Sequence, residues 1–293
     1  MTYTPGLTPE PGKRRRLSAN PAHARTKTPA KPVPKTVPGA APAELKESHL
    51  RRLRAESGAG RAAPSPLHRY SVAVLGDDGS VAEFDHLAPR ELFLEDICAC
   101  FGRGTLIATE SGQMAIEDLQ PGDRIRTRDD GLQTLRWISR CTLPPPEGEE
   151  PAEEVAIRIK ADALGELRPL QDLVVSARFR LLTNHPSCAA LFGSPETLAP
   201  AVDLLDGESI LPMRPAPEME FFNLMFDSHQ IIEANGLETE SYHPGNFGVA
   251  VMSLEMQSHL RRLFPHLKGD LNGFGRTARP ILKGFEAEAL QLY

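Results

Sequence analysis

The stretch Cys100-Phe-Gly-Arg-Gly-Thr-Leu-Ile-Ala-Thr-Glu-Ser-Gly-Gln-Met-Ala-Ile-Glu-Asp-Leu-Gln-Pro-Gly-Asp-Arg-Ile125 decides the fold prediction. Short strand-like runs, such as residues 105–109, alternate in it with turns rich in Gly, Pro and Asp. Pro121 and Gly122 suit the two central positions of a type II turn, in which Asp123 would accept backbone hydrogen bonds. Because the runs are short and the turns closely spaced, the pattern predicts an all-β fold.

The sequence on either side of this stretch extends the prediction. Residues 70–75 and 80–84 flank Gly76-Asp-Asp-Gly79, a hairpin signature. Trp137 lies in a later strand-like run, and we expect it to fill the core without a role in a site. The apolar residues of 253–264 have helical spacing and Pro265 follows them, so a helix is predicted there. We expect this helix and the final segment to pack on the β domain.

The first 66 residues have a different composition. Residues 1–41 are rich in Pro, Ala, Thr and basic residues, which predicts disorder, and only residues 43–54 have a weak helical pattern. Residues 1–70 hold fourteen Lys and Arg against four Glu, a balance of +10 that leaves −16 for residues 71–293. We interpret the segment as a solvated tail. The alternative is contact of residues 13–61 with nucleic acid or an acidic surface, which predicts an affinity that falls steeply with salt.

Composition also bounds the class of protein. No run approaches the roughly 18 apolar residues of a membrane span, and the start of the chain lacks the apolar core of a secretory signal. No membrane insertion is expected, and a cytoplasmic location is weakly favoured while the localisation stays open. The four cysteines are irregularly spaced, which favours a reducing compartment. Cys98 and Cys100 lack a second ligand pair at zinc spacing, so no metal is expected. No cofactor is expected either, and the partner is unknown.

Several blocks of the chain together resemble the Hint domain of inteins and hedgehog proteins. The first is the opening stretch, with its leading Cys, its Thr-x-x-x-Thr strand and its Leu-x-x-Gly-Asp turn. The second is Phe222-Asn-Leu-Met-Phe-Asp-Ser-His-Gln-Ile-Ile-Glu-Ala-Asn-Gly236, and Asp172-Leu-Val-Val-Ser176, residues 191–201 and Glu240-Ser-Tyr-His-Pro-Gly245 are similar to a bacterial subfamily called Hint_2. The resemblance implies a mainly β, horseshoe-shaped Hint fold with pseudo-two-fold symmetry, whose two arms bring Cys100 close to the Ala-Asn-Gly region.

The expected domain organisation follows from this resemblance. Residues 1–66 form the basic, disordered tail and residues 67–99 a β-hairpin lead-in. Residues 100–245 form the Hint domain, and residues 246–293 a helical extension that packs on it.

The resemblance also implies a self-cleavage reaction, and one residue that this reaction needs is replaced in this sequence. In self-cleaving Hint domains the leading Cys, here Cys100, attacks the carbonyl of the preceding residue, here Ala99, and a His protonates the departing nitrogen. Phe179, in Ser176-Ala-Arg-Phe179, stands where that His is expected, and an apolar ring cannot transfer a proton. No His-Asn pair follows residue 236 before a nucleophile, so splicing is not expected.

Two interpretations of the site remain open. In one, the chain cleaves itself at Ala99–Cys100, with His229 or His185 as a substitute proton donor and Asp227 orienting His229. In the other, the chain is a degenerate Hint scaffold that acts as a binding or interaction module, with the basic tail as its tether. Whether it is an enzyme is therefore uncertain from the sequence.

Overall fold

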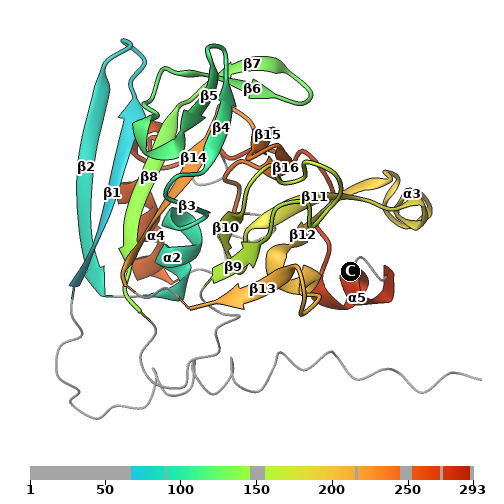
Figure 1. Cartoon of the computed structure of the whole chain (residues 1–293). Helices are drawn as coiled ribbons and strands as arrows, with labels where there is room; N and C mark the ends of the chain where they lie inside the picture. Colours follow the sequence, from blue (N-terminus) through green and yellow to red (C-terminus); the bar gives the residue numbers. More distant parts are fainter. Residues whose placement is uncertain are drawn as a thin grey trace, which may run out of the picture. The chain divides into compact units, whose positions relative to one another are not determined.

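The computed structural model describes residues 67–89, 91–145, 156–214, 217–244, 253–270 and 273–290. These residues form two antiparallel sheets with short helices packed against them (Figure 1). The mainly β fold is therefore confirmed. The predictions for residues 1–66, including the weak helix over 43–54, fall outside the described residues.

The first sheet, sheet A, has eight strands. Their order across the sheet is β13 (Ile210–Met213), β9 (Ala156–Ile159), β10 (Leu173–Ser176), β3 (Phe101–Gly102), β14 (Met219–Met225), β8 (Trp137–Leu143), β1 (Leu67–Leu75) and β2 (Val81–Pro89). The β1–β2 pair is the predicted hairpin, closed where Leu75 lies opposite Val81. Because β1 also pairs with β8, the segment before Cys100 belongs to the same sheet as the strands after it.

The second sheet, sheet B, is built from the strands between those of sheet A. Its order is β12 (Glu196–Pro200), β11 (Arg180–Asn184), β16 (Leu237–Glu240), β15 (Ile231–Ala234), β4 (Leu106–Thr109), β6 (Arg124–Thr127) and β7 (Gly131–Thr134), with β5 (Gly112–Ala115) paired to β4. The chain crosses repeatedly from one sheet to the other. Ala234 in β15 lies opposite Ile107 in β4, so the Ala-Asn-Gly region pairs with the strand that follows the Cys100 stretch.

The turn at Pro121 and Gly122 has the predicted geometry. Gly122 has a φ of 106°, and the N–H of Asp123 donates to the carbonyl of Gln120 at 3.0 Å. The Asp123 carboxylate in turn accepts from the N–H of Gln120 at 2.7 Å. This reciprocal pair fixes the entry into β6 and gives Asp123 the structural role that the sequence indicated.

The helices are α2 (Leu92–Cys98), α3 (Pro186–Phe192), α4 (Leu254–Leu263) and α5 (Gly284–Leu290), with 3-10 turns η1 (Ile116–Asp118), η3 (Ala201–Leu204) and η5 (Pro265–Leu267). The predicted C-terminal helix is α4, which packs on sheet A. Trp137 is fully buried there, its Nε1 donates to the carbonyl of Leu263 at 2.7 Å, and its ring stacks on Phe264 at 4.8 Å. Trp137 is thus a core residue, as predicted.

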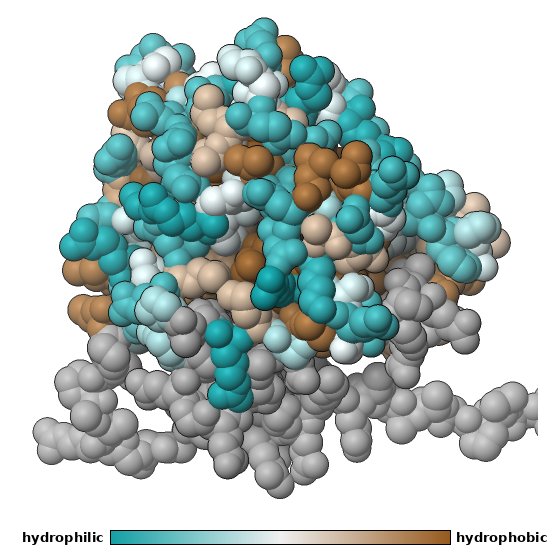
Figure 2. All heavy atoms as spheres, in the orientation of Figure 1, coloured by the Kyte–Doolittle hydropathy of each residue, from teal (hydrophilic) through white to brown (hydrophobic). Residues whose placement is uncertain are grey.

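Figure 2 shows one face of the molecule, which is hydrophilic over most of its area and carries separate apolar patches. No helix in the described part of the chain has the length and apolar character that crossing a membrane requires.

Candidate functional site around Cys100

The Ala99–Cys100 peptide bond is held on both sides by hydrogen bonds. Before it, the carbonyl of Cys98 accepts from the Ser139 hydroxyl at 3.1 Å. After it, the N–H of Cys100 donates to the carbonyl of Phe222 at 3.1 Å, and the carbonyl of Cys100 accepts from the N–H of Ser176 at 2.9 Å. The bond therefore lies at the junction where α2 ends and β3 enters sheet A between β10 and β14.

The Cys100 thiol is enclosed and lies among acidic groups. Its residue is only 6% exposed, and Ala99 is 1% exposed. Burial raises the pKa of the thiol well above its usual range; the carboxylates of Glu240 and Asp96 raise it further, while Arg180 opposes them. Because the thiolate is the nucleophilic form, this environment disfavours attack.

Phe179 packs against Phe101, the residue that follows Cys100. The turn after β10 closes where the N–H of Phe179 donates to the carbonyl of Ser176 at 3.2 Å. Its ring is 3% exposed and lies edge-on to Phe101, with 4.5 Å between ring centroids. The position from which a Hint histidine is expected to act thus holds an apolar ring packed into the core.

A buried polar cluster lies nearby and contains His229. Oε1 of Glu240 accepts from the backbone N–H of Arg180 at 3.1 Å and from its Nε at 2.6 Å. Nε2 of His229 is 3.3 Å from Oε2 of the same carboxylate. The N–H of Ala278 donates to Nδ1 of His229 at 3.0 Å, so this nitrogen acts as an acceptor while Nε2 lies toward Glu240.

His243 connects this cluster to the surface. Its ring stacks on His229 at 4.9 Å between centroids, and Arg180 Nη2 donates to its carbonyl at 2.6 Å. Burial, aided by the neighbouring His229, lowers the pKa of His243 to about 4, so the ring is neutral at neutral pH. A pocket of about 440 Å³, lined by His243 and residues 275–280, opens beside it.

Asp96 is a second acidic neighbour of Cys100. Its backbone oxygen is 3.9 Å from the Cys100 sulfur, and its carboxylate accepts from Nη1 of Arg178 at 2.7 Å. Burial raises the pKa of Asp96 to about 6, although Arg178 acts against this shift. A fraction of Asp96 is therefore protonated near neutral pH, which makes it a potential proton donor that the sequence did not reveal.

His185 and Asp227, the other expected site residues, have partners outside the Cys100 surroundings. Nδ1 of His185 accepts from the N–H of Ser187 at 3.3 Å and so caps α3. His185 follows β11 and Phe179 precedes it, so the two residues are separated by six positions, or ~20 Å at 3.3 Å per residue. Asp227 binds Arg136 at 2.9 Å, and Glu240 is the carboxylate beside His229. The catalytic roles of His185 and His229 stay predictions.

In the described part of the chain, the one group of three or more side chains suited to hold a metal ion lies away from Cys100, between α2 and α4.

The sequence matches one family model of known proteins. The Hint_2 family model, described as a Hint domain, matches residues 99–246, which begins at the residue before Cys100. No curated protein matches the chain.

Proposed function

Since the chain belongs to the Hint_2 family of Hint domains, we propose that it is a Hint scaffold that no longer cleaves itself and acts as a binding module. In this proposal the Ala99–Cys100 bond stays intact. The basic N-terminal segment then remains covalently attached to the folded domain and serves as its tether.

The observation that carries the proposal is the packing of Phe179 against Phe101, one residue beyond the Cys100 nucleophile. An N-to-S acyl shift needs a proton for the departing Cys100 nitrogen, and general acid help is worth ~10²–10⁴ in rate. The group bonded to that N–H is the carbonyl of Phe222, which accepts protons in hydrogen bonds and cannot donate one. With a buried, neutral thiol as well, both halves of the reaction are disfavoured.

The integration of the lead-in supports the same conclusion. Cleavage would separate residues 67–99 from the rest of the chain. Yet β1 pairs with β8 along five residues, from Tyr70 opposite Cys141 to Val74 opposite Trp137, and the Asn223 side chain donates to the carbonyl of Ile97 at 2.7 Å. A segment that completes a sheet is a part of the scaffold rather than a cargo to be released.

An open strand edge supports a binding role. Within the described residues, β2 is the last strand of sheet A, and its backbone has no partner strand on the outer side. The β1–β2 hairpin exposes four large apolar side chains, those of Leu67, Val81, Phe84 and Leu87. An exposed edge with apolar side chains is suited to strand addition by an extended peptide.

Self-cleavage is the second candidate, and Asp96 is the observation that favours it. Its pKa of about 6 and the electrostatic effect of its carboxylate on the Cys100 thiol make its carboxyl group the candidate to protonate the departing nitrogen in place of the missing imidazole. In that case Asp96→Asn would slow cleavage by ~10²-fold or more.

Intact-mass analysis of the purified full-length chain tests the two candidates. The inert scaffold predicts a single 32.1 kDa species over days, with or without hydroxylamine to trap a thioester, and the same result for Cys100→Ala. Fragments of roughly 11 and 21 kDa that vanish in Cys100→Ala would establish live acyl-shift chemistry and contradict the proposal.

A restored donor tests the cause. Phe179→His returns an imidazole to the position from which a Hint histidine is expected to act, and we expect this variant alone to cleave slowly at Ala99–Cys100. Phe179→Leu is the matched control, since it disturbs the same packing without adding a proton donor. If both variants fold and both stay intact, the site has lost more than the imidazole.

A further inference from the structure

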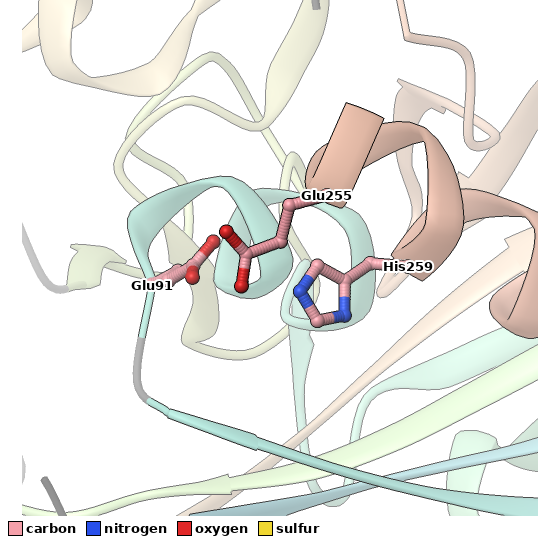
Figure 3. Close-up of side chains that lie close together, drawn as sticks. All are labelled: Glu91, Glu255 and His259. Atoms are coloured by element: carbon pink, nitrogen blue, oxygen red, sulfur yellow. The ribbon is translucent and has the colours of Figure 1, made fainter. Parts of the chain in front are cut away.

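A group of potential metal ligands joins α4 to the end of the lead-in. Glu255 and His259 are four residues apart on α4, so their side chains lie on the same face of the helix. Glu91 is the N-cap residue of α2. One potential ligand atom from each of these three residues lies within 4.8 Å of the other two. Figure 3 shows the two carboxylates facing each other and the His259 ring beside them.

The His259 ring is already oriented by a neighbour. Its Nδ1 is 2.6 Å from Nε2 of His86, a residue of β2 that is buried. Its other nitrogen, Nε2, is buried and has no hydrogen-bond partner among the described residues. In Figure 3 one ring nitrogen points toward the carboxylates, and it is the one that the His86 contact leaves free. When Nδ1 carries the proton and donates it to His86, Nε2 presents a lone pair to the two glutamates.

We propose that Glu91, Glu255 and His259 bind a divalent transition metal ion of the Zn²⁺ class. One imidazole nitrogen and two carboxylate oxygens form a donor set that suits Zn²⁺, Mn²⁺ or Co²⁺ better than Ca²⁺ or Mg²⁺, which prefer oxygen alone. The two carboxylates balance the charge of the ion. In the tautomer with the proton on Nδ1, the contact with His86 takes the place of the outer-shell hydrogen bond that metal-bound histidines donate to a carboxylate, a carbonyl or water.

The distances are compatible with binding after a small movement. Ligand atoms about 2.0–2.2 Å from an ion in tetrahedral geometry are roughly 3.5 Å from one another. Side chains within 4.8 Å reach that separation through changes of rotamer, and Glu255 is exposed and free to make one. Three protein ligands leave one position for water or a partner's ligand. The bound ion would fasten α4 to the segment that precedes Cys100.

Titration of the full-length, tag-free, metal-stripped chain with ZnCl₂ in a calorimeter tests the site. We expect one Zn²⁺ per chain and a higher melting temperature when Zn²⁺ is bound. Glu255→Gln should weaken the affinity by at least ~10-fold, and His259→Gln by as much or more. Glu110→Gln is the matched control, because Glu110 is an exposed glutamate on the turn after β4. The Zn²⁺ affinity of this variant should equal that of the wild type.

The cysteines are the competing ligands, and Co²⁺ distinguishes them. A site made of imidazole and carboxylates gives a Co²⁺ spectrum without a thiolate charge-transfer band. A strong thiolate band, an affinity unchanged in Glu255→Gln, or no binding of Zn²⁺, Mn²⁺ or Co²⁺ by the wild type would each overturn the proposal. Because the Glu255 side chain is exposed, Glu255→Gln should not unfold the chain, so a weaker affinity of this variant reports the loss of a ligand. Circular dichroism of the variant verifies that it is folded. None of these outcomes depends on whether Ala99–Cys100 is cleaved.

Discussion

Cys100 has the sequence context of a nucleophile and the surroundings of a core residue. All four cysteines of the chain are free and buried, and burial raises the pKa of Cys98, Cys100 and Cys141. We therefore predict that Ellman's reagent at pH 8 labels less than one thiol per native chain within minutes and four in guanidinium chloride. Rapid labelling of one native thiol that is lost in Cys100→Ala would show that Cys100 is accessible and ionised, against the inert-scaffold proposal.

The residues of the candidate site differ in how far the sequence could reveal them. Cys100 and Phe179 were identified from the resemblance, because both positions align with the motifs of the family. Arg180 and Glu240 escaped prediction, because a buried ion pair between β11 and β16 becomes visible only when the strands are paired. The same holds for Glu91 and His259, which are far apart in the sequence and come close together only in the folded chain.

At the scale of one element, α4 depends on the N-cap residue that precedes it, Ser253. The Ser253 hydroxyl accepts from the N–H of Met256 at 3.1 Å, which satisfies one free donor of the first turn. Ser253→Ala should lower the free energy of unfolding by ~0.5–2 kcal/mol, measured by urea denaturation. Ser258→Ala is the matched control: Ser258 is exposed within α4, and alanine there should leave stability unchanged or slightly raise it. Equal destabilisation by both changes would argue against the cap.

The elements that the sequence predicted well are those with a local signal. The hairpin of β1 and β2 has its turn residues between two apolar runs, and α4 has a capping serine and a terminating proline. The two-residue strand β3 carries no such signal, since Phe101 and Gly102 become a strand only by pairing with β10 and β14. The division into two sheets likewise depends on long-range pairing, which one sequence does not reveal.

Over the whole molecule, buried titrating groups determine how stability varies with mild acid. Burial lowers the pKa of both His243 and His266 to about 4, whereas a histidine in the unfolded chain titrates near ~6.5. Between these values the unfolded chain takes up protons that the native rings do not, so stability falls as the pH falls. Asp96 acts in the opposite direction, because its native pKa of about 6 exceeds its unfolded value, and the native state holds that proton.

His86 adds to this balance, because burial lowers its pKa as well, so the free energy of unfolding should fall as the pH falls from 6 to 4.5. Urea titrations followed by the fluorescence of Trp137, the one tryptophan of the chain, measure this slope. His266→Phe is the informative variant, since both ring nitrogens of His266 are buried without hydrogen-bond partners in the described part of the chain. Removing that ring takes one buried histidine out of this balance, so the slope should become shallower by up to ~1.4 kcal/mol per pH unit. A slope unchanged in His266→Phe, or stability that rises toward pH 4.5 in the wild type, would contradict this assignment of the buried protons.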